Sequence, residues 1–146
     1  MSQLSTLISS WASLLASDTA LQAWAQATYS KAATVFLGQN VKALPTEAAC
    51  PLIVLFEGDL LEGLEAETEM SVRIGVCVSN KDATTTGNLV SFDGLSELHE
   101  LADLIVEALS DPTSEHRVVS VSHEFQGSEF YPQWPATLEF VVKPWG

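Results

Sequence analysis

The chain has 146 residues, and its 47% hydrophobic content is enough to fill the core of one ordinary domain. Nineteen acidic residues against six basic ones give a formal net charge of −13, which opposes binding to free nucleic acid or to anionic membranes through charge attraction. From the length and the hydrophobic content we expect a single domain over residues 1–146, with an N-terminal helical segment at 1–33 and a sheet with one packing helix at 34–146.

The N-terminal segment predicts two helices. The first has apolar residues at helical spacing and ends near Ser17, its apolar positions being Leu4, Leu7, Ile8, Trp11, Leu14 and Leu15. Asp18 is expected to cap the second helix, which continues to about Ala33. This second helix has a weaker apolar face, formed by Leu21, Trp24, Ala25, Thr28 and Ala32.

The N-terminal helix does not read as a targeting or membrane segment. No basic residue precedes Lys31, and Ser and Trp interrupt the apolar positions, which is unlike a signal peptide. The longest apolar run, residues 52–56, is far shorter than the roughly 20 residues that span a bilayer. The sequence therefore predicts a soluble protein made in a cytoplasm.

The middle of the chain predicts two strands and a helix. Residues 34–37 also favour a strand, and 38–51 read as a loop. "PLIVLF" is a short, continuously apolar strand, and residues 70–78 alternate strictly between apolar and more polar positions. The polar residues 80–88 are read as a loop leading to Asp93, the expected cap of a helix that ends at Asp111 and Pro112. Its expected buried residues are Leu95, Leu98, Ala102, Ile105 and Leu109.

Two further strands are predicted near the C-terminus, where they are expected to form a hairpin. Their alternating positions are Val119, Val121, His123 and Phe125 in one strand, and Leu138, Phe140 and Val142 in the other. The order is helix-helix-strand-strand-helix-strand-strand. Because short connections favour antiparallel pairing, we predict an α+β fold with a single, mostly antiparallel sheet covered by helices.

The stretch "FEGDLLEGLEAETE", residues 56–69, holds six carboxylates and no base: Glu57, Asp59, Glu62, Glu65, Glu67 and Glu69. These residues do not follow the ligand order of a calcium-binding loop, although a cation site is one interpretation. A second is a hydrated connector whose charge keeps the flanking strands from pairing with other chains. A third is an acidic patch lining the hole of a ring, where it would keep a polyanion from adhering to the wall.

The sequence offers little for catalysis, and we expect no catalytic, cofactor-binding or metal-binding residues. His99 and Asp103 form an i, i+4 pair on one helix face, which a metal could use but which is also typical of a solvated polar face. His116 and His123 have no nucleophile in a recognisable setting nearby. Both nucleotide-binding glycine motifs are missing from the sequence, and Cys50 and Cys77 read as core thiols.

Several segments together give the chain a resemblance to a protein family. They are "ATVFLGQNVKALPTEAACPLIVLFEGD" at 33–59 with its Cys50 and Pro51, the strand at 70–78, the helix at 95–109, and "FYPQWPATLEFVVK" at 130–143 with its Pro132, Trp134 and Ala136. In this order they resemble the tail terminator and tail completion proteins of long-tailed bacteriophages. The resemblance covers about residues 33–143.

The resemblance implies a minor tail protein of the virion, assembled in the host cytoplasm and without catalytic activity. It implies a homohexameric ring that caps the tail tube, contacts the tail tube protein and the head-tail connector protein, and lets DNA pass through without specific binding. Phe130, Tyr131 and Trp134 in "GSEFYPQWP" form a candidate interface, because aromatic side chains dominate interface hot spots. The same segment could instead be a loop that covers the core.

Two other hypotheses remain open. An unrelated cytosolic α+β binding or adaptor domain would use the same aromatic segment without catalysis and would be a monomer or dimer. A metal-dependent enzyme would use His99, Asp103 and part of the acidic patch, and metal ions would then raise its thermal stability.

Overall fold

The computed structural model describes residues 3–38, 49–61, 69–110, 116–126 and 130–144. The helices are α1 (Gln3–Ser17), α2 (Thr19–Tyr29) and α3 (Asp93–Leu109). The strands are β1 (Thr34–Leu37), β2 (Leu52–Leu61), β3 (Glu69–Ser79), β4 (Ala83–Thr86), β5 (Leu89–Phe92), β6 (His116–Phe125) and β7 (Gln133–Pro144). None of the helices in these described ranges has the length and hydropathy that crossing a membrane requires.

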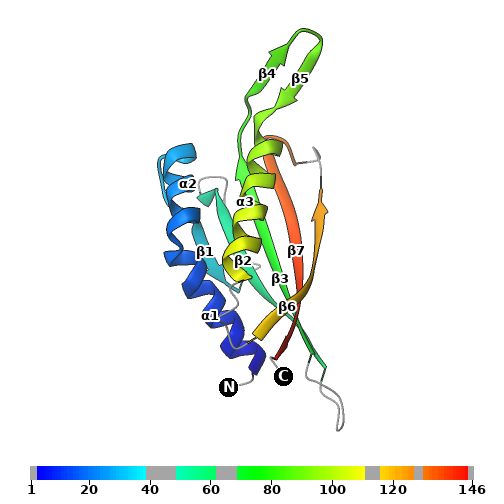
Figure 1. Ribbon diagram of the computed structural model, residues 1–146. Helices are drawn as coiled ribbons and strands as arrows, with labels where there is room; N and C mark the ends of the chain where they lie inside the picture. The colour runs from blue at the N-terminus through cyan, green and yellow to red at the C-terminus, as the bar shows by residue number, and fades with distance from the viewer. Residues whose placement is uncertain (1–2, 39–48, 62–68, 111–115, 127–129, 145–146) are drawn as a thin grey trace.

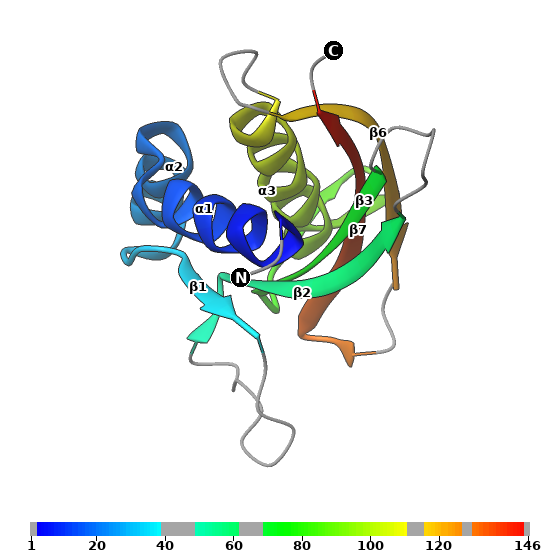
Figure 2. The ribbon, with the colours of Figure 1, turned by 90° about the horizontal axis from the view of Figure 1, so that it is seen from below.

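The main sheet has five strands in the order β1-β2-β3-β7-β6. β1 pairs with β2 in parallel, and every other neighbouring pair in this sheet is antiparallel. The three helices lie on one face of the sheet, which curls around α3 (Figures 1 and 2). The α+β class and the mostly antiparallel sheet predicted from the sequence are confirmed, but β1 and the separate pair β4–β5 add to the predicted strand order.

The core lies between the helices and the sheet. The alternation predicted for β3 is confirmed, because its residues from Met70 to Val78 at every second position are at most 2% exposed. Leu138, Phe140 and Val142 of β7 are fully buried beside them. The ring of Trp11 on α1 meets Phe140 edge-on with the centroids 5.3 Å apart, and this contact ties α1 to β7.

A second, smaller apolar cluster lies on the opposite face of the sheet, because successive side chains of a strand point to opposite faces. It contains the buried residues Cys50, Leu52 and Val54, with Phe56 and Cys77 packed against them. Cys50 is therefore a buried thiol, as expected, and Cys77 is a half-buried one.

The start of α2 agrees with the sequence and its end does not. The carboxylate of Asp18 accepts a hydrogen bond from the backbone N–H of Leu21 at 2.9 Å, so the predicted cap is confirmed. The helix ends at Tyr29 rather than near Ala33, because Ser30 takes the left-handed conformation with φ of 60°.

The start of α3 differs from the prediction that Asp93 is its cap. The helix begins at Asp93, Phe92 occupies the cap position, and no side chain makes a capping hydrogen bond there. The Asp93 carboxylate instead accepts a hydrogen bond from the hydroxyl of Thr84 at 2.9 Å. Leu95, which was expected on the buried face, is 40% exposed, whereas Leu98, Ala102, Ile105 and Leu109 are buried as predicted.

A register shift changes the face predicted for β6. The pairing of β6 with β7 shifts between Val118 and Ser120, which inserts an extra residue at Val119. Val118 packs against the core, and Val119 is 41% exposed. The predicted position of Val119 on the apolar face is therefore wrong, while Val121 and Phe125 pack against the core as expected.

Candidate assembly surface

Strands β4 and β5 form an arm that projects beyond the main sheet and the helices (Figure 1). The two strands are joined by Gly87 and Asn88, and Gly87 has φ of 62°, a conformation that glycine adopts without a steric penalty. Every residue from Lys81 to Phe92 is exposed. An isolated two-stranded hairpin is marginally stable in water, so packing at its base has to hold this arm in place.

Three large apolar side chains of the arm are exposed to solvent. Leu89 is 62% exposed, Val90 is 53% exposed and Phe92 is 45% exposed. In a two-stranded arm both faces are open, and a row of such residues along it is typical of a surface that contacts another molecule. Residues 83–92 carry no charged side chain, which removes one cost of burying them.

Hydrogen bonds and aromatic contacts anchor the base of the arm. The indole N–H of Trp134 donates to the backbone oxygen of Asn80 at 3.0 Å, and the hydroxyl of Tyr131 donates to that of Lys81 at 2.7 Å. The ring of Phe92 lies 5.9 Å from the rings of both Tyr131 and Trp134. The arm is thus fixed to β7 by aromatic side chains that the sequence grouped in one segment.

The three aromatic residues of the predicted interface have different environments. Phe130 is 55% exposed and Tyr131 is 48% exposed, so both are accessible to a partner. Trp134 is only 4% exposed and belongs to the core, where its indole occupies the space that a Cβ at Gly94 would need. Trp134 therefore positions the surface instead of forming its outer part.

Below the arm, Glu97 of α3 forms a polar network with α2 and with the segment that leads from β3 into the arm. Its carboxylate accepts a hydrogen bond from the hydroxyl of Tyr29 at 2.6 Å, and Oε2 accepts one from the side-chain amide of Asn80 at 2.7 Å. Burial, this hydrogen bond and the negative charge of Glu97 raise the pKa of Tyr29 well above its ordinary value. Close by, the indole of Trp24 donates to Glu100 at 2.8 Å.

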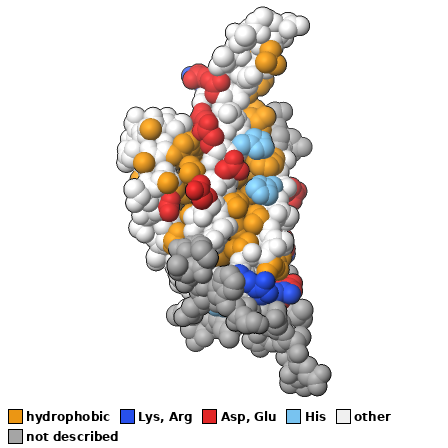
Figure 3. All heavy atoms as spheres, viewed as in Figure 1, with side chains coloured by type: hydrophobic (Ala, Val, Ile, Leu, Met, Phe, Trp, Pro, Cys, Tyr) orange, Lys and Arg blue, Asp and Glu red, His pale blue; other side chains and the backbone are white. Residues whose placement is uncertain are grey.

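Charge is unevenly distributed over the helical face. Neither α1 nor α2 contains a charged residue within its bounds. On α3, by contrast, Glu100, Asp103 and Glu107 are all exposed. Figure 3 shows these two regions side by side, with acidic side chains over α3 and none over α2.

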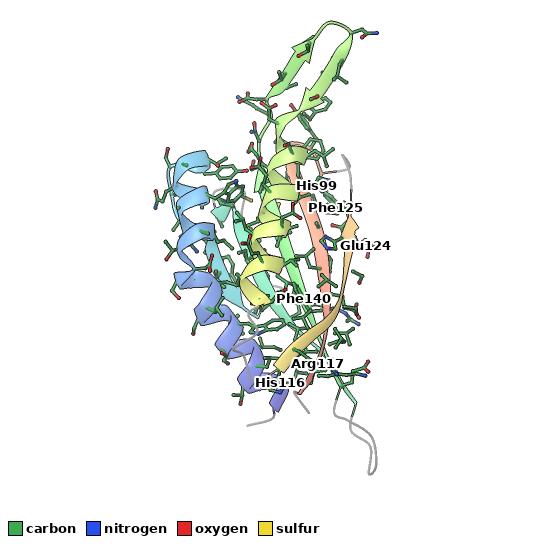
Figure 4. The ribbon with its side chains drawn as sticks, in the orientation of Figure 1. His99, His116, Arg117, Glu124, Phe125 and Phe140 are labelled. Atoms are coloured by element: carbon green, nitrogen blue, oxygen red, sulfur yellow. The ribbon has the colours of Figure 1, made fainter. Side chains whose placement is uncertain are left out.

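The histidine side chains at α3 and β6 pack against an aromatic ring. The ring of His99 lies 4.2 Å from that of Phe125 (Figure 4). The ring of His123 lies 5.9 Å from that of Phe125. Asp103 is exposed one turn further along α3. Within the described ranges, no group of three or more His, Cys, Asp or Glu side chains gathers as a metal site would require.

Most of the acidic patch lies outside the described residues. This applies to Glu62, Glu65 and Glu67, and to the side chains of Glu57 and Asp59, whose backbones belong to β2. Glu69 is described, and its carboxylate lies 3.9 Å from the ammonium group of Lys143. An ion pair as exposed as this one contributes little to the free energy of unfolding.

The arm is the main feature that the reading of the sequence missed. The composition of residues 80–88, in which threonine, glycine and asparagine dominate, predicts a loop and not a hairpin. The available signal was Gly87-Asn88 between two β-branched or alternating segments, a two-residue spacing that is typical of a hairpin.

No family model matches the chain, and no curated protein matches it.

Proposed function

We propose that this chain is a virion structural protein, a tail terminator or tail completion subunit that forms a ring on the tail tube and joins it to the head connector. The order of segments between residues 33 and 143 supports the proposal through its resemblance to that family. The observation that carries it furthest is the arm, because an exposed apolar hairpin on a small domain is typical of a subunit that is completed by assembly.

The net charge of −13 is consistent with this role. A ring around DNA has to let the polyanion move, and an acidic subunit repels phosphate groups instead of binding them. The acidic patch would add to this effect if several copies placed it around a common hole.

The test is the molar mass in solution, measured by light scattering over a concentration series at low and at physiological salt. We expect a species of about six subunits whose formation increases with concentration and with salt, because salt screens the repulsion between acidic copies. Negative-stain electron microscopy of the same samples should then show rings with a central hole.

A chain that stays monomeric or dimeric under all these conditions would contradict the ring. That outcome would favour the alternative, a cytosolic α+β binding or adaptor domain that uses the arm to hold a different protein.

A further inference from the structure

The arm presents one continuous apolar face. The pairs Thr85↔Val90 and Ala83↔Phe92 are two positions apart, so Val90 and Phe92 share one face of the hairpin. The ring of Phe92 contacts that of Tyr131, which extends this face to the base of the arm. We call Val90, Phe92 and Tyr131 the arm face. Each is between 45% and 53% exposed.

The outer side of α2 on a second copy of this chain is well suited to the arm face. Covering the exposed carboxylates of α3 with apolar groups would remove them from water without providing partners, which is costly. The outer side of α2 has no charge and exposes Ala20, Ala23 and Ala27, whose small side chains allow close approach. The acids next to α2 already accept hydrogen bonds from it, Asp18 from the backbone N–H of Leu21, Glu97 from Tyr29 and Glu100 from Trp24.

We propose that the arm face of one copy packs on the outer side of α2 of a second copy. Two chains that each carry −13 repel one another, so a contact between them is favoured where both surfaces are uncharged. The arm and α2 satisfy this condition together.

Because the two surfaces differ, the contact is head-to-tail, and repeating it builds a ring when the rotation between neighbours closes. The contact between the arm face and α2 is thus the subunit contact of the proposed ring. That repeated contacts close into a ring rests on the proposed function.

Photo-cross-linking tests where the arm lies. A benzophenone amino acid replaces Val90 in one sample and, as the matched control on the other face of the arm, Thr86 in a second. Equal amounts of ¹⁴N- and ¹⁵N-labelled copies are mixed, irradiated and digested, so that peptides of mixed label identify contacts between copies. We expect cross-links from position 90 to residues 19–29 of the other copy, and few from position 86. Mixed-label peptides that map elsewhere, or none at all, would overturn the inference.

Complementation tests whether the contact is head-to-tail. Val90→Asp places a charge on the arm face, and Ala23→Glu places one on α2, where both sites are exposed and glutamate favours a helix. Each variant alone should lose at least about tenfold in self-association constant, which corresponds to about 1.4 kcal/mol. A mixture should form pairs, since each variant retains the surface that the other lacks. Thr86→Asp should assemble like the wild type, and thermal melting followed by circular dichroism checks that all variants fold.

The outcomes separate this inference from the proposed function. A closed ring that is unaffected by Val90→Asp would overturn the inference and leave the ring standing. Cross-links from position 90 to α2 without a closed ring would support the contact and contradict the ring function.

Discussion

At the residue scale, Gly94 and Trp134 show how one position without a side chain lets a helix and a strand pack closely. The first turn of α3 lies against the indole of Trp134, which fills the space beside Gly94 and is held by its hydrogen bond to Asn80. Since Trp134 also contacts Phe92, the same indole ties the start of the helix to the base of the arm.

We predict that Gly94→Ala destabilises the protein. The added methyl group must displace a buried ring, and overpacking of this kind costs about 1–3 kcal/mol, more than the gain of up to about 1 kcal/mol in helix propensity. Urea unfolding followed by tryptophan fluorescence measures the change. Ser96→Ala, at an exposed position of the same helix, is the control and should stay within about 0.5 kcal/mol of the wild type. Equal stability of the two variants would contradict the packing described for Trp134.

Tyr29 gives a second prediction at this scale, concerning alkaline pH. Its pKa is raised in the folded state, so the protonated hydroxyl contributes its full stability below the ordinary pKa of about 10. Above that pH the unfolded chain loses the proton more readily, and this contribution decreases. The free energy of unfolding of the wild type should therefore exceed that of Tyr29→Phe at pH 7, and the difference should shrink above about pH 10.

Urea unfolding of both proteins from pH 7 to pH 11 measures this difference. The loss in Tyr29→Phe at pH 7 is expected to be about 1.5 kcal/mol, the low end for a hydrogen bond to a charged group, because the site is only half-buried. Tyr131→Phe is the matched control, since its hydroxyl donates to a backbone oxygen and not to a carboxylate. A difference between wild type and Tyr29→Phe that is constant with pH would exclude the coupling to Glu97.

At the element scale, polar side chains define the ends of α2, a helix with only two fully buried residues. Asp18 caps its start, and the side chain of Gln22 bridges its neighbours, donating to the Leu15 carbonyl at 3.0 Å and accepting from the Ala33 N–H at 2.8 Å. The apolar face of α2 is small, so these hydrogen bonds and the one from Tyr29 to Glu97 help to hold the helix in its position. The uncharged outer side of α2 is thereby left open to solvent.

Replacing the cap tests this account of α2. Asp18→Ala should lower the free energy of unfolding by about 1 kcal/mol, because the N–H of Leu21 loses its partner. Asp18→Asn keeps an oxygen acceptor without the charge and should stay close to the wild type. Thermal unfolding followed by circular dichroism at 222 nm compares the three proteins. A loss in Asp18→Asn as large as that in Asp18→Ala would mean that charge, and not the hydrogen bond, stabilises this helix end.

The elements also show what sequence patterns could and could not predict. Strand β3 was predicted because one of its faces is fully buried, so the alternation from Met70 to Val78 is strict. Strand β6 is at the edge of the sheet, where an extra residue at Val119 shifts the alternation without a visible sequence signal. The arm has no buried face of its own, so hydrophobic periodicity was a weak guide to it. The burial of Trp134 depends on Gly94, forty residues away in the chain, which no local pattern reveals.

At the scale of the whole molecule, the distribution of charge is the property most relevant to assembly. The first 30 residues contain one charged residue, Asp18, so nearly all of the net charge of −13 is carried by the rest of the chain. Association of such chains has to overcome a general repulsion, which is screened within about 8 Å at physiological ionic strength. Uncharged surfaces on α2 and on the arm allow contact without adding to that repulsion.

The acidic patch provides the last prediction, because it concentrates charge in one short stretch. Replacing Glu62, Glu65 and Glu67 with glutamine changes the formal net charge from −13 to −10 while keeping side-chain size. The free energy of unfolding should change by no more than about 0.5 kcal/mol, as is usual for surface substitutions. Association should then occur at lower salt than in the wild type, because less repulsion has to be screened. Light scattering over a salt series measures this shift, and urea unfolding measures the stability.

Two results would contradict this account of the patch. Loss of the folded state in the triple variant would mean that these carboxylates are buried or bind a cation. An unchanged salt dependence would mean that the patch lies too far from its counterparts in the assembly to oppose it. Replacing Glu100, Asp103 and Glu107 with glutamine removes the same charge from α3, so a comparison of the two variants shows which acidic region the neighbouring subunits approach.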